Sequence, residues 1–233
     1  MKKIIGVYRN EKMHWVGDGF PMKGLFSYDR LGQAISPFLL LDYASPYPFE
    51  PSTAQHGVGS HPHRGFETVT IAYQGEVTHK DSAGGGGTIK TGDVQWMTAG
   101  AGLVHEEFHS PEFAKKGGLF QMAQLWVNLP AKDKMTAPRY QAIEAKDIPV
   151  LQFKDDAGHL RVIAGEFAKT QGPASTFSPI NVWDGELTVG HKEVIQVPVG
   201  HTVLFVVLEG EMLLNGTQKV LDSSIVIFNK DSD

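Results

Sequence analysis

The stretch that decides the fold is Ser60-His61-Pro62-His63-Arg64-Gly65-Phe66-Glu67, which places two histidines two residues apart. Residues with this spacing on an extended strand point to the same face, so His61 and His63 should project together. Further along, His105 and Glu107 have the same spacing. If the two stretches lie side by side in one sheet, three imidazoles and one carboxylate converge. That donor set suits a divalent transition metal.

The chain between the two histidine stretches is typical of a small antiparallel barrel. Residues 68–73 are rich in β-branched and aromatic side chains and predict a strand. Glycine-containing turns then separate three further short segments at 77–80, 88–90 and 94–97. Successive short strands joined by such turns indicate a barrel. The alternative, histidines on solvated loops, explains the strand pattern less well.

These residues resemble a known family. The pattern His-x-His-x3-Glu, followed by a Gly-Asp turn and Gly-x-x-His, is the two-part cupin pattern, and its fuller wording is similar to that of the pirins. The residues that carry the likeness are 61–69, 92–100, His105 and 125–129. One departure is Gly100, which stands where the general cupin motif has proline. The resemblance implies an all-β bicupin, with two antiparallel jelly-roll β-barrels in tandem.

The resemblance also implies which residues bind the metal. The four expected ligands are His61, His63, His105 and Glu107. In many other cupins the glutamate of the first motif is a ligand, which would nominate Glu67. The pirin-like wording favours Glu107 and leaves Glu67 to orient a histidine. Phe66 and Arg64 are expected beside the pocket, where Arg64 either assists an anionic substrate or forms a structural ion pair.

Three imidazoles and one carboxylate would leave two adjacent positions free on an octahedral metal, as in iron sites that bind oxygen and substrate. A structural zinc would instead prefer a closed tetrahedral set. We expect Fe(II), with Mn, Ni, Co, Cu or Zn as substitutes. The resemblance implies a quercetin 2,3-dioxygenase, which cleaves a small aromatic, flavonol-like substrate with O2 and releases carbon monoxide. Glu107 would be both a ligand and the candidate base for the substrate hydroxyl.

Two other functions fit the same sequence. Some pirins are described as partners of transcription factors or metabolic enzymes, so the alternative is a metal-binding regulatory protein with a protein partner and no physiological turnover. A metal-dependent isomerase or hydrolase on the same barrel is a third interpretation, since fold does not fix function. Catalytic consumption of oxygen separates the dioxygenase from both.

The sequence predicts two unequal halves. Residues 73–77 match 208–212, and counting back from these turns places Gln196 and Pro198 where the first half has its two histidines. The second half should therefore bind no metal. We expect a metal-bearing N-terminal barrel at 1–130, a linker at 131–160 and a metal-free C-terminal barrel at 161–233. No segment can close the second barrel, so it is either truncated or open at one edge.

Composition narrows the class of protein. The chain has 233 residues, 41% of them hydrophobic, which is enough for packed cores. Its net charge of −5 is dispersed and argues against direct binding of nucleic acid. With no cysteine, it has no disulfides, thiolate nucleophile or iron–sulfur cluster. No stretch approaches the roughly 20 apolar residues of a membrane span, and the N-terminal apolar run is too short for a signal peptide. We therefore expect a cytoplasmic protein that does not bind membranes.

Overall fold

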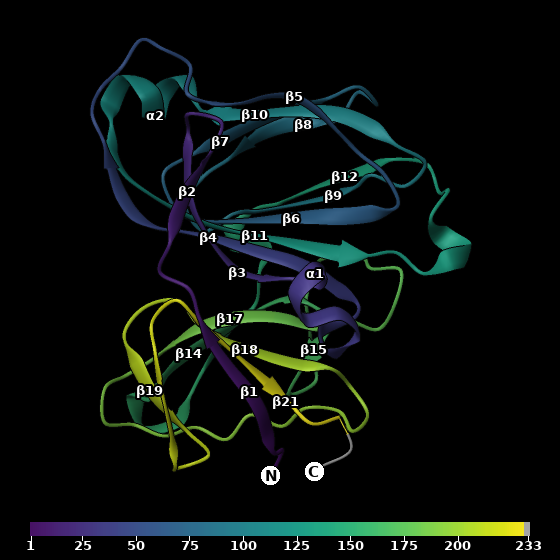
Figure 1. Ribbon diagram of the computed structural model, residues 1–233. Coiled ribbons are helices and arrows are strands. Elements are labelled where there is room, and N and C mark those ends of the chain that lie inside the picture. The colour runs from purple at the N-terminus through teal and green to yellow at the C-terminus, as the bar shows by residue number, and fades with distance from the viewer. Residues whose placement is uncertain (231–233) are drawn as a thin grey trace.

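The computed structural model describes residues 1–230 and is built mainly of antiparallel strands (Figure 1). The prediction of an all-β fold is confirmed. The largest sheet has seven strands in the order β12-β9-β6-β11-β4-β3-β2. Its strands are β2 (Met13–Val16), β3 (Phe20–Ser27), β4 (Phe38–Phe49), β6 (Phe66–Gln74), β9 (Val94–Thr98), β11 (Gly118–Asn128) and β12 (Arg139–Ile143).

A four-stranded sheet in the order β5-β10-β7-β8 covers one face of the larger sheet (Figure 1). It consists of β5 (Gly57–His63), β7 (Val77–Asp81), β8 (Gly86–Ile89) and β10 (Leu103–His109). Val77 and Ile89 of this sheet pack on Phe20, Met22 and Phe120 of the other, forming the core between them. The two sheets make the N-terminal jelly roll.

The second half of the chain forms smaller sheets on the opposite face (Figure 1). One sheet contains β1 (Ile4–Arg9), β21 (Ser224–Phe228) and β18 (Val203–Val207), and another contains β13 (Val150–Gln152), β14 (Gly158–Ala164) and β17 (Val182–Leu187). Two hairpins complete the second half of the chain. In one, β15 (Glu166–Phe167) pairs with β16 (Thr170–Gln171), and in the other, β19 (Glu211–Leu214) pairs with β20 (Gln218–Leu221).

Helices are few and short. They are α1 (Tyr28–Leu31), α2 (Pro111–Lys116) and the 3-10 turns η1 (Gly32–Ile35), η2 (Ala131–Asp133), η3 (Ala145–Asp147) and η4 (Lys154–Asp156). The start of α2 is defined by its sequence: Pro111 occupies the first turn, and the Ser110 hydroxyl accepts a hydrogen bond from the Phe113 amide at 3.0 Å.

The predicted division into residues 1–130, 131–160 and 161–233 stays a prediction, but several strand pairings cross its boundaries. β1, at the start of the chain, pairs with β21 of the second half, with Ile4 opposite Phe228. β12, inside the expected linker, pairs with β9 and extends the seven-stranded sheet. β2 lies within the first of these ranges and pairs with β3 at the edge of the seven-stranded sheet.

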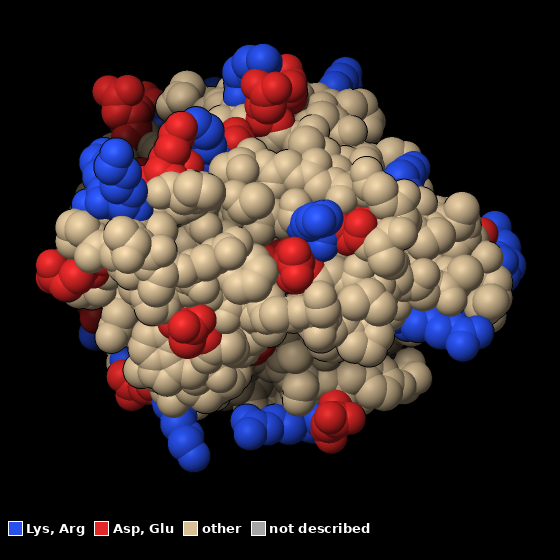
Figure 2. Space-filling view, turned by 90° about the horizontal axis from the view of Figure 1, so that it is seen from above, with Lys and Arg blue, Asp and Glu red and all other residues tan. Residues whose placement is uncertain are grey.

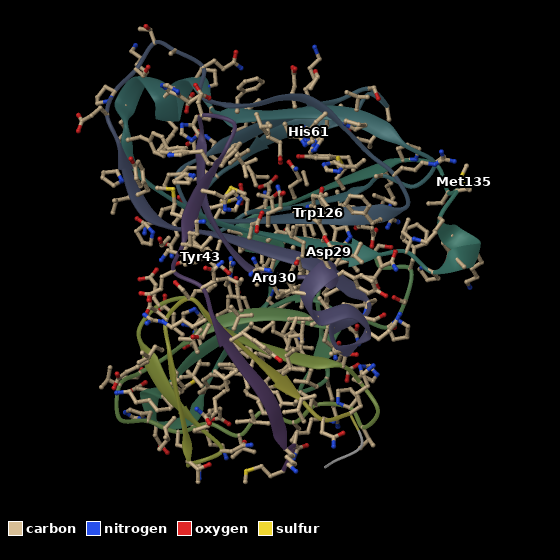
Figure 3. The ribbon with its side chains drawn as sticks, viewed as in Figure 1. Asp29, Arg30, Tyr43, His61, Trp126 and Met135 are labelled. Carbon is tan, nitrogen blue, oxygen red and sulfur yellow. The ribbon has the colours of Figure 1, made fainter. Side chains whose placement is uncertain are left out.

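The seven-stranded sheet is buried on both faces because the two halves share it. Val69 and Trp96 pack on Ile163 and Val182 of the second half in one cluster. In a neighbouring cluster Tyr43 packs on β21, and its hydroxyl lies 3.3 Å from Glu209 Oε1. Figure 3 shows Tyr43 at this junction. Since both faces are covered, the central strands β6 and β9 carry near-continuous buried residues.

The outer surface is mixed in charge. Figure 2, which looks down on the molecule from above the view of Figure 1, shows basic and acidic side chains interspersed on that face. Within residues 1–230, no helix is long and apolar enough to cross a membrane.

Replacing Ile163 by alanine should lower the free energy of unfolding by about 2–5 kcal/mol, because this fully buried side chain fills the core that the two halves share. Denaturant titration measures the effect. Ile5→Ala is the matched control, since Ile5 is 56% exposed and its loss should change the stability by no more than about 0.5 kcal/mol. Equal losses for the two variants would contradict a shared core.

Candidate metal centre

The three histidines meet because β5 and β10 are neighbours. Their antiparallel register pairs His105 with His61 and Leu103 with His63. Ring centroids are 4.3 Å apart for His61 and His105, 4.7 Å for His63 and His105, and 4.8 Å for His61 and His63. The register shifts between His105 and Glu107, where β10 is locally irregular. His61 and His63, which are two residues apart on β5, therefore project to the same side, as their spacing in the sequence suggested.

The donor atoms form two overlapping groups. One nitrogen from each of His61, His63 and His105 lies within 4.8 Å of the others, and the same limit holds for a second group of His79, His105 and Glu107. Glu107 is thus grouped with His105 rather than with all three expected histidines. It nevertheless borders the cavity that His61 and His63 also line.

The histidine cluster fits a metal ion. His105 Nε2 is buried and has no hydrogen-bond partner, and an unpaired buried nitrogen is costly unless something binds it. The Nδ1 of His61 lies 2.8 Å from the Gly59 carbonyl oxygen. If this nitrogen donates its proton to the carbonyl, Nε2 is left with a free lone pair. Imidazole nitrogens with this orientation suit zinc, copper, iron or nickel.

Burial keeps the imidazoles of His63 and His105 in the neutral form that metal binding needs. Desolvation, with a smaller effect of His61, lowers the pKa of His63 to about 4. Desolvation, together with the neighbouring histidines His61, His63 and His79, lowers the pKa of His105 to about 2. Both side chains therefore keep their lone pairs at neutral pH.

A buried chain of polar groups supports His105 from behind. Its Nδ1 lies 3.1 Å from His79 Nδ1, and His79 Nε2 lies 3.2 Å from Asp81 Oδ2. If His105 Nε2 is to offer a lone pair, its proton sits on Nδ1 and is donated to His79, whose own proton then goes to Asp81. Gln95 Nε2 also approaches His79 Nδ1, at 3.4 Å. The chain fixes the tautomer of His105.

Sequence reasoning missed His79. It lies in β7 two residues after buried Val77 and points to the same inner face. Its position on that face was the available signal, but a single histidine in a strand is weak evidence for a site.

Glu107 is held by two amides. Gln95 Nε2 donates to Glu107 Oε1 at 3.1 Å, and Gln124 Nε2 donates to Glu107 Oε2 at 3.2 Å. The Tyr140 hydroxyl in turn donates to Gln95 Oε1 at 3.2 Å. These bonds fix the position of a carboxylate that is only 4% exposed. Neither Gln95 nor Gln124 was predicted to serve the site.

His61 and His63 line a cavity of about 520 Å³, a size typical of small-molecule sites. Figure 3 shows His61 and Trp126 on opposite sheets, both directed into the space between them. The wall is mostly apolar. Its lining includes Val16, Phe20, Met22, Leu40, Asp42, Val58, Met122, Gln124 and Trp126 besides residues of the histidine stretch. The contribution of β2, β3 and β4 to this wall was not predicted.

The three other predicted site residues take different positions. Phe66 lies beside the cluster, its ring 5.1 Å from His63 and 4.6 Å from Trp126. Arg64 is exposed, lines the cavity, and directs Nη2 at Met135 Sδ at 3.4 Å; no ion pair involves it within residues 1–230.

Glu67 does not take the position that the sequence suggested. Its Oε1 accepts a hydrogen bond from the Thr98 hydroxyl at 2.7 Å. It follows Phe66 in β6 and shares a face with Val69 and Ile71, which pack toward the second half. The expected contact between Glu67 and a ligand histidine is therefore wrong.

Strand order, an inward-facing histidine cluster and a cavity between two sheets define a protein of the cupin fold. The family model described as Pirin matches residues 19–127. A protein of Pseudomonas aeruginosa provisionally named a quercetin 2,3-dioxygenase is 55% identical over 231 residues, which cover 99% of this chain and 80% of that protein. Pirin-1 of Arabidopsis thaliana is 37% identical over 212 residues, covering 91% of this chain and 67% of its own length. The chain belongs to the pirin family.

Solved structures agree. A crystal structure from Acinetobacter baumannii described as quercetin 2,3-dioxygenase is 67% identical, with a TM-score of 0.98, and the match covers 100% of this chain and 81% of that one. A bacterial pirin of Escherichia coli in complex with nickel(II) is 19% identical, with a TM-score of 0.68 over 98% of this chain and 94% of that one. At this identity the second match supports the fold alone.

The metal-free protein should lose stability as pH falls from about 6.5 toward about 4. The pKa of His63 in the folded protein is lowered from 6.5 to about 4, so the unfolded chain binds more protons in this window and acid favours it. Thermal unfolding across this range in the presence of a chelator measures the slope. His63→Asn should flatten the profile, whereas His191→Asn, at an exposed position, should not. Equal slopes for wild type and His63→Asn would contradict the lowered pKa.

Proposed function

We propose that this protein is a metal-dependent dioxygenase that cleaves quercetin-like flavonols with O2 and releases carbon monoxide. The observation that carries the proposal is the position of His105 Nε2, which is buried, has no hydrogen-bond partner and belongs to a cluster with His61 and His63. These two neighbouring histidines line a largely apolar cavity of about 520 Å³. The relatives from P. aeruginosa and A. baumannii carry names of the same activity. This supports an enzyme over a regulatory protein without turnover.

We assign the metal to His61, His63, His105 and Glu107, with Fe(II) as the expected ion and Mn, Ni, Co, Cu or Zn as substitutes. When bound, such an ion supplies Lewis acidity toward the oxygens of the flavonol and the redox chemistry that activates O2. The protein's own contribution is to hold the neutral imidazoles in place and to shape the cavity.

The cavity wall suits a flat aromatic molecule. The rings of Phe66 and Trp126 lie 4.6 Å apart and tilted by 32° beside His63, and Met22, Met122 and other apolar side chains line the same cavity. Such a wall excludes water and binds a ring system by burying apolar area. Arg64 at the cavity edge offers a positive charge to an anionic flavonol.

Glu107 serves best as a ligand. To act also as the base for the substrate hydroxyl it would have to exchange a metal bond for a proton, and binding to a cation reduces its basicity. The amides of Gln95 and Gln124 hold both of its oxygens where they are, which favours the ligand role. The cytoplasmic location stays a prediction.

Protein reconstituted anaerobically with Fe(II) and then aerated with quercetin should consume oxygen over many turnovers per metal, with matching loss of flavonol absorbance and release of carbon monoxide. Oxygen electrode traces and headspace analysis measure both. Binding of quercetin without oxygen uptake, across all the metals named above, would overturn the dioxygenase proposal and favour the regulatory alternative.

His61→Ala should abolish turnover and lower metal affinity by more than the roughly 10–100-fold that loss of an outer partner costs, because it removes one of the three imidazoles. Metal content after dialysis and oxygen uptake measure the two effects. The control is His191→Ala, because His191 is exposed and lies outside the histidine cluster. This variant should retain both its metal content and its oxygen uptake. Full activity in His61→Ala would rule out the assigned ligand set.

A further inference from the structure

One carboxylate in the cavity wall has no assigned role. Asp42 lies in β4, opposite Gln124 of β11 and opposite Gly24 of β3. Directly paired residues in a sheet share a face, so Asp42 points to the same side as Gln124, whose amide bonds Glu107. Both residues line the cavity. Asp42 therefore faces the space in front of the metal centre.

The half-buried Asp42 carboxylate has no side-chain or backbone partner. Within residues 1–230 no hydrogen bond or ion pair reaches it, and His14 is the one titratable group that acts on its pKa from nearby. Burial raises the pKa of Asp42. Its neighbours along the wall, Leu40 and Met22, are apolar. Opposite it, Gly24 has no side chain, and a Cβ there would lie 3.3 Å from Asp42 Oδ1.

A carboxylate in such surroundings costs stability unless something donates to it. Two buried carboxylates of this half have donors: Glu107 has two amides and Glu67 has the Thr98 hydroxyl. Asp42, which lines the cavity, has no such donor within residues 1–230. An arrangement of this kind selects ligands that bring a hydrogen-bond donor.

We propose that Asp42 determines substrate specificity by accepting a hydrogen bond from a phenolic hydroxyl of the substrate that does not bind the metal. The site would then hold its substrate at two points, by oxygens at the histidine cluster and by a ring hydroxyl at the opposite wall. It selects polyhydroxylated flavonols over those that carry only the 3-hydroxyl. The inference rests on the proposed function, since it assumes that a flavonol occupies this cavity.

The test compares the binding of two flavonols by the full chain loaded anaerobically with Fe(II), so that no turnover occurs. Quercetin carries ring hydroxyls and 3-hydroxyflavone lacks them, and fluorescence or absorbance titration gives both dissociation constants. In Asp42→Leu the preference for quercetin, expressed as the ratio of the two constants, should fall by about 10–100-fold, the value of a hydrogen bond to a charged group. Asp42→Asn keeps the shape of the side chain and a neutral hydrogen-bond acceptor. Its ratio of the two dissociation constants should therefore lie between those of wild type and Asp42→Leu.

Asp29→Asn is the matched control, because Asp29 is exposed in α1 and does not line the cavity. It should leave the ratio unchanged. Thermal unfolding checks folding, and Asp42→Leu should melt no lower than wild type because it removes a half-buried carboxylate that no side chain pairs.

The outcomes separate the two proposals. An unchanged ratio in Asp42→Leu, with quercetin still bound and oxidised on aeration, overturns the role of Asp42 and leaves the proposed function intact. Failure of the wild-type protein to bind either flavonol overturns both. A reduced preference in the two Asp42 variants and none in Asp29→Asn supports the inference.

Discussion

The register between β5 and β10 is the constraint on which the site depends. His105 lies opposite His61, and this pairing turns every second side chain of both strands toward the cavity. A slip of one residue would send the imidazoles to the outer face and their neighbours Pro62 and Val104 inward. The pairing is secured on the other side as well, because β10 also pairs with β7 and places His105 opposite Asp81. The polar chain behind His105 is thus a product of the same register.

The seven-stranded sheet forms a rigid cavity wall opposite β5 and β10. The second half of the chain packs on the outer face of this sheet, so neither face is exposed to solvent at β6 and β9. A hydrophobic core covers each face of the sheet. Side chains anchored in such a sheet lose little further freedom when a ligand binds. This sheet carries Gln95 and Gln124, whose hydrogen bonds hold Glu107 in position. The second half, which lacks the histidine motif, contributes by stiffening the sheet rather than by chemistry.

The sequence was informative where the alternation of side chains along one strand decides which residues share a face. The alternation that joins His61 to His63 and His105 to Glu107 is local, and so the cluster and the all-β class could be predicted from it. Glu67 shows the limit: Gly65 turns the chain with a φ of 77° between β5 and β6, and the phase of one strand does not carry through such a turn into the next. Asp42 was missed as a single charged residue in a largely apolar strand, and His79 as a lone histidine in a largely polar one. Only the pairing of distant strands reveals what each side chain faces.

The pairing of β1 with β21 has a consequence for how the protein is made. The two strands are far apart in sequence, with Ile4 opposite Phe228, whereas the sheets of the N-terminal jelly roll use strands that lie between Met13 and Ile143. At translation rates of about 5–20 residues per second, β1 leaves the ribosome roughly 10–40 s before its partner β21. The strands that carry the histidine cluster can pair during this interval. The nascent chain therefore forms its histidine cluster before β1 has a strand to pair with.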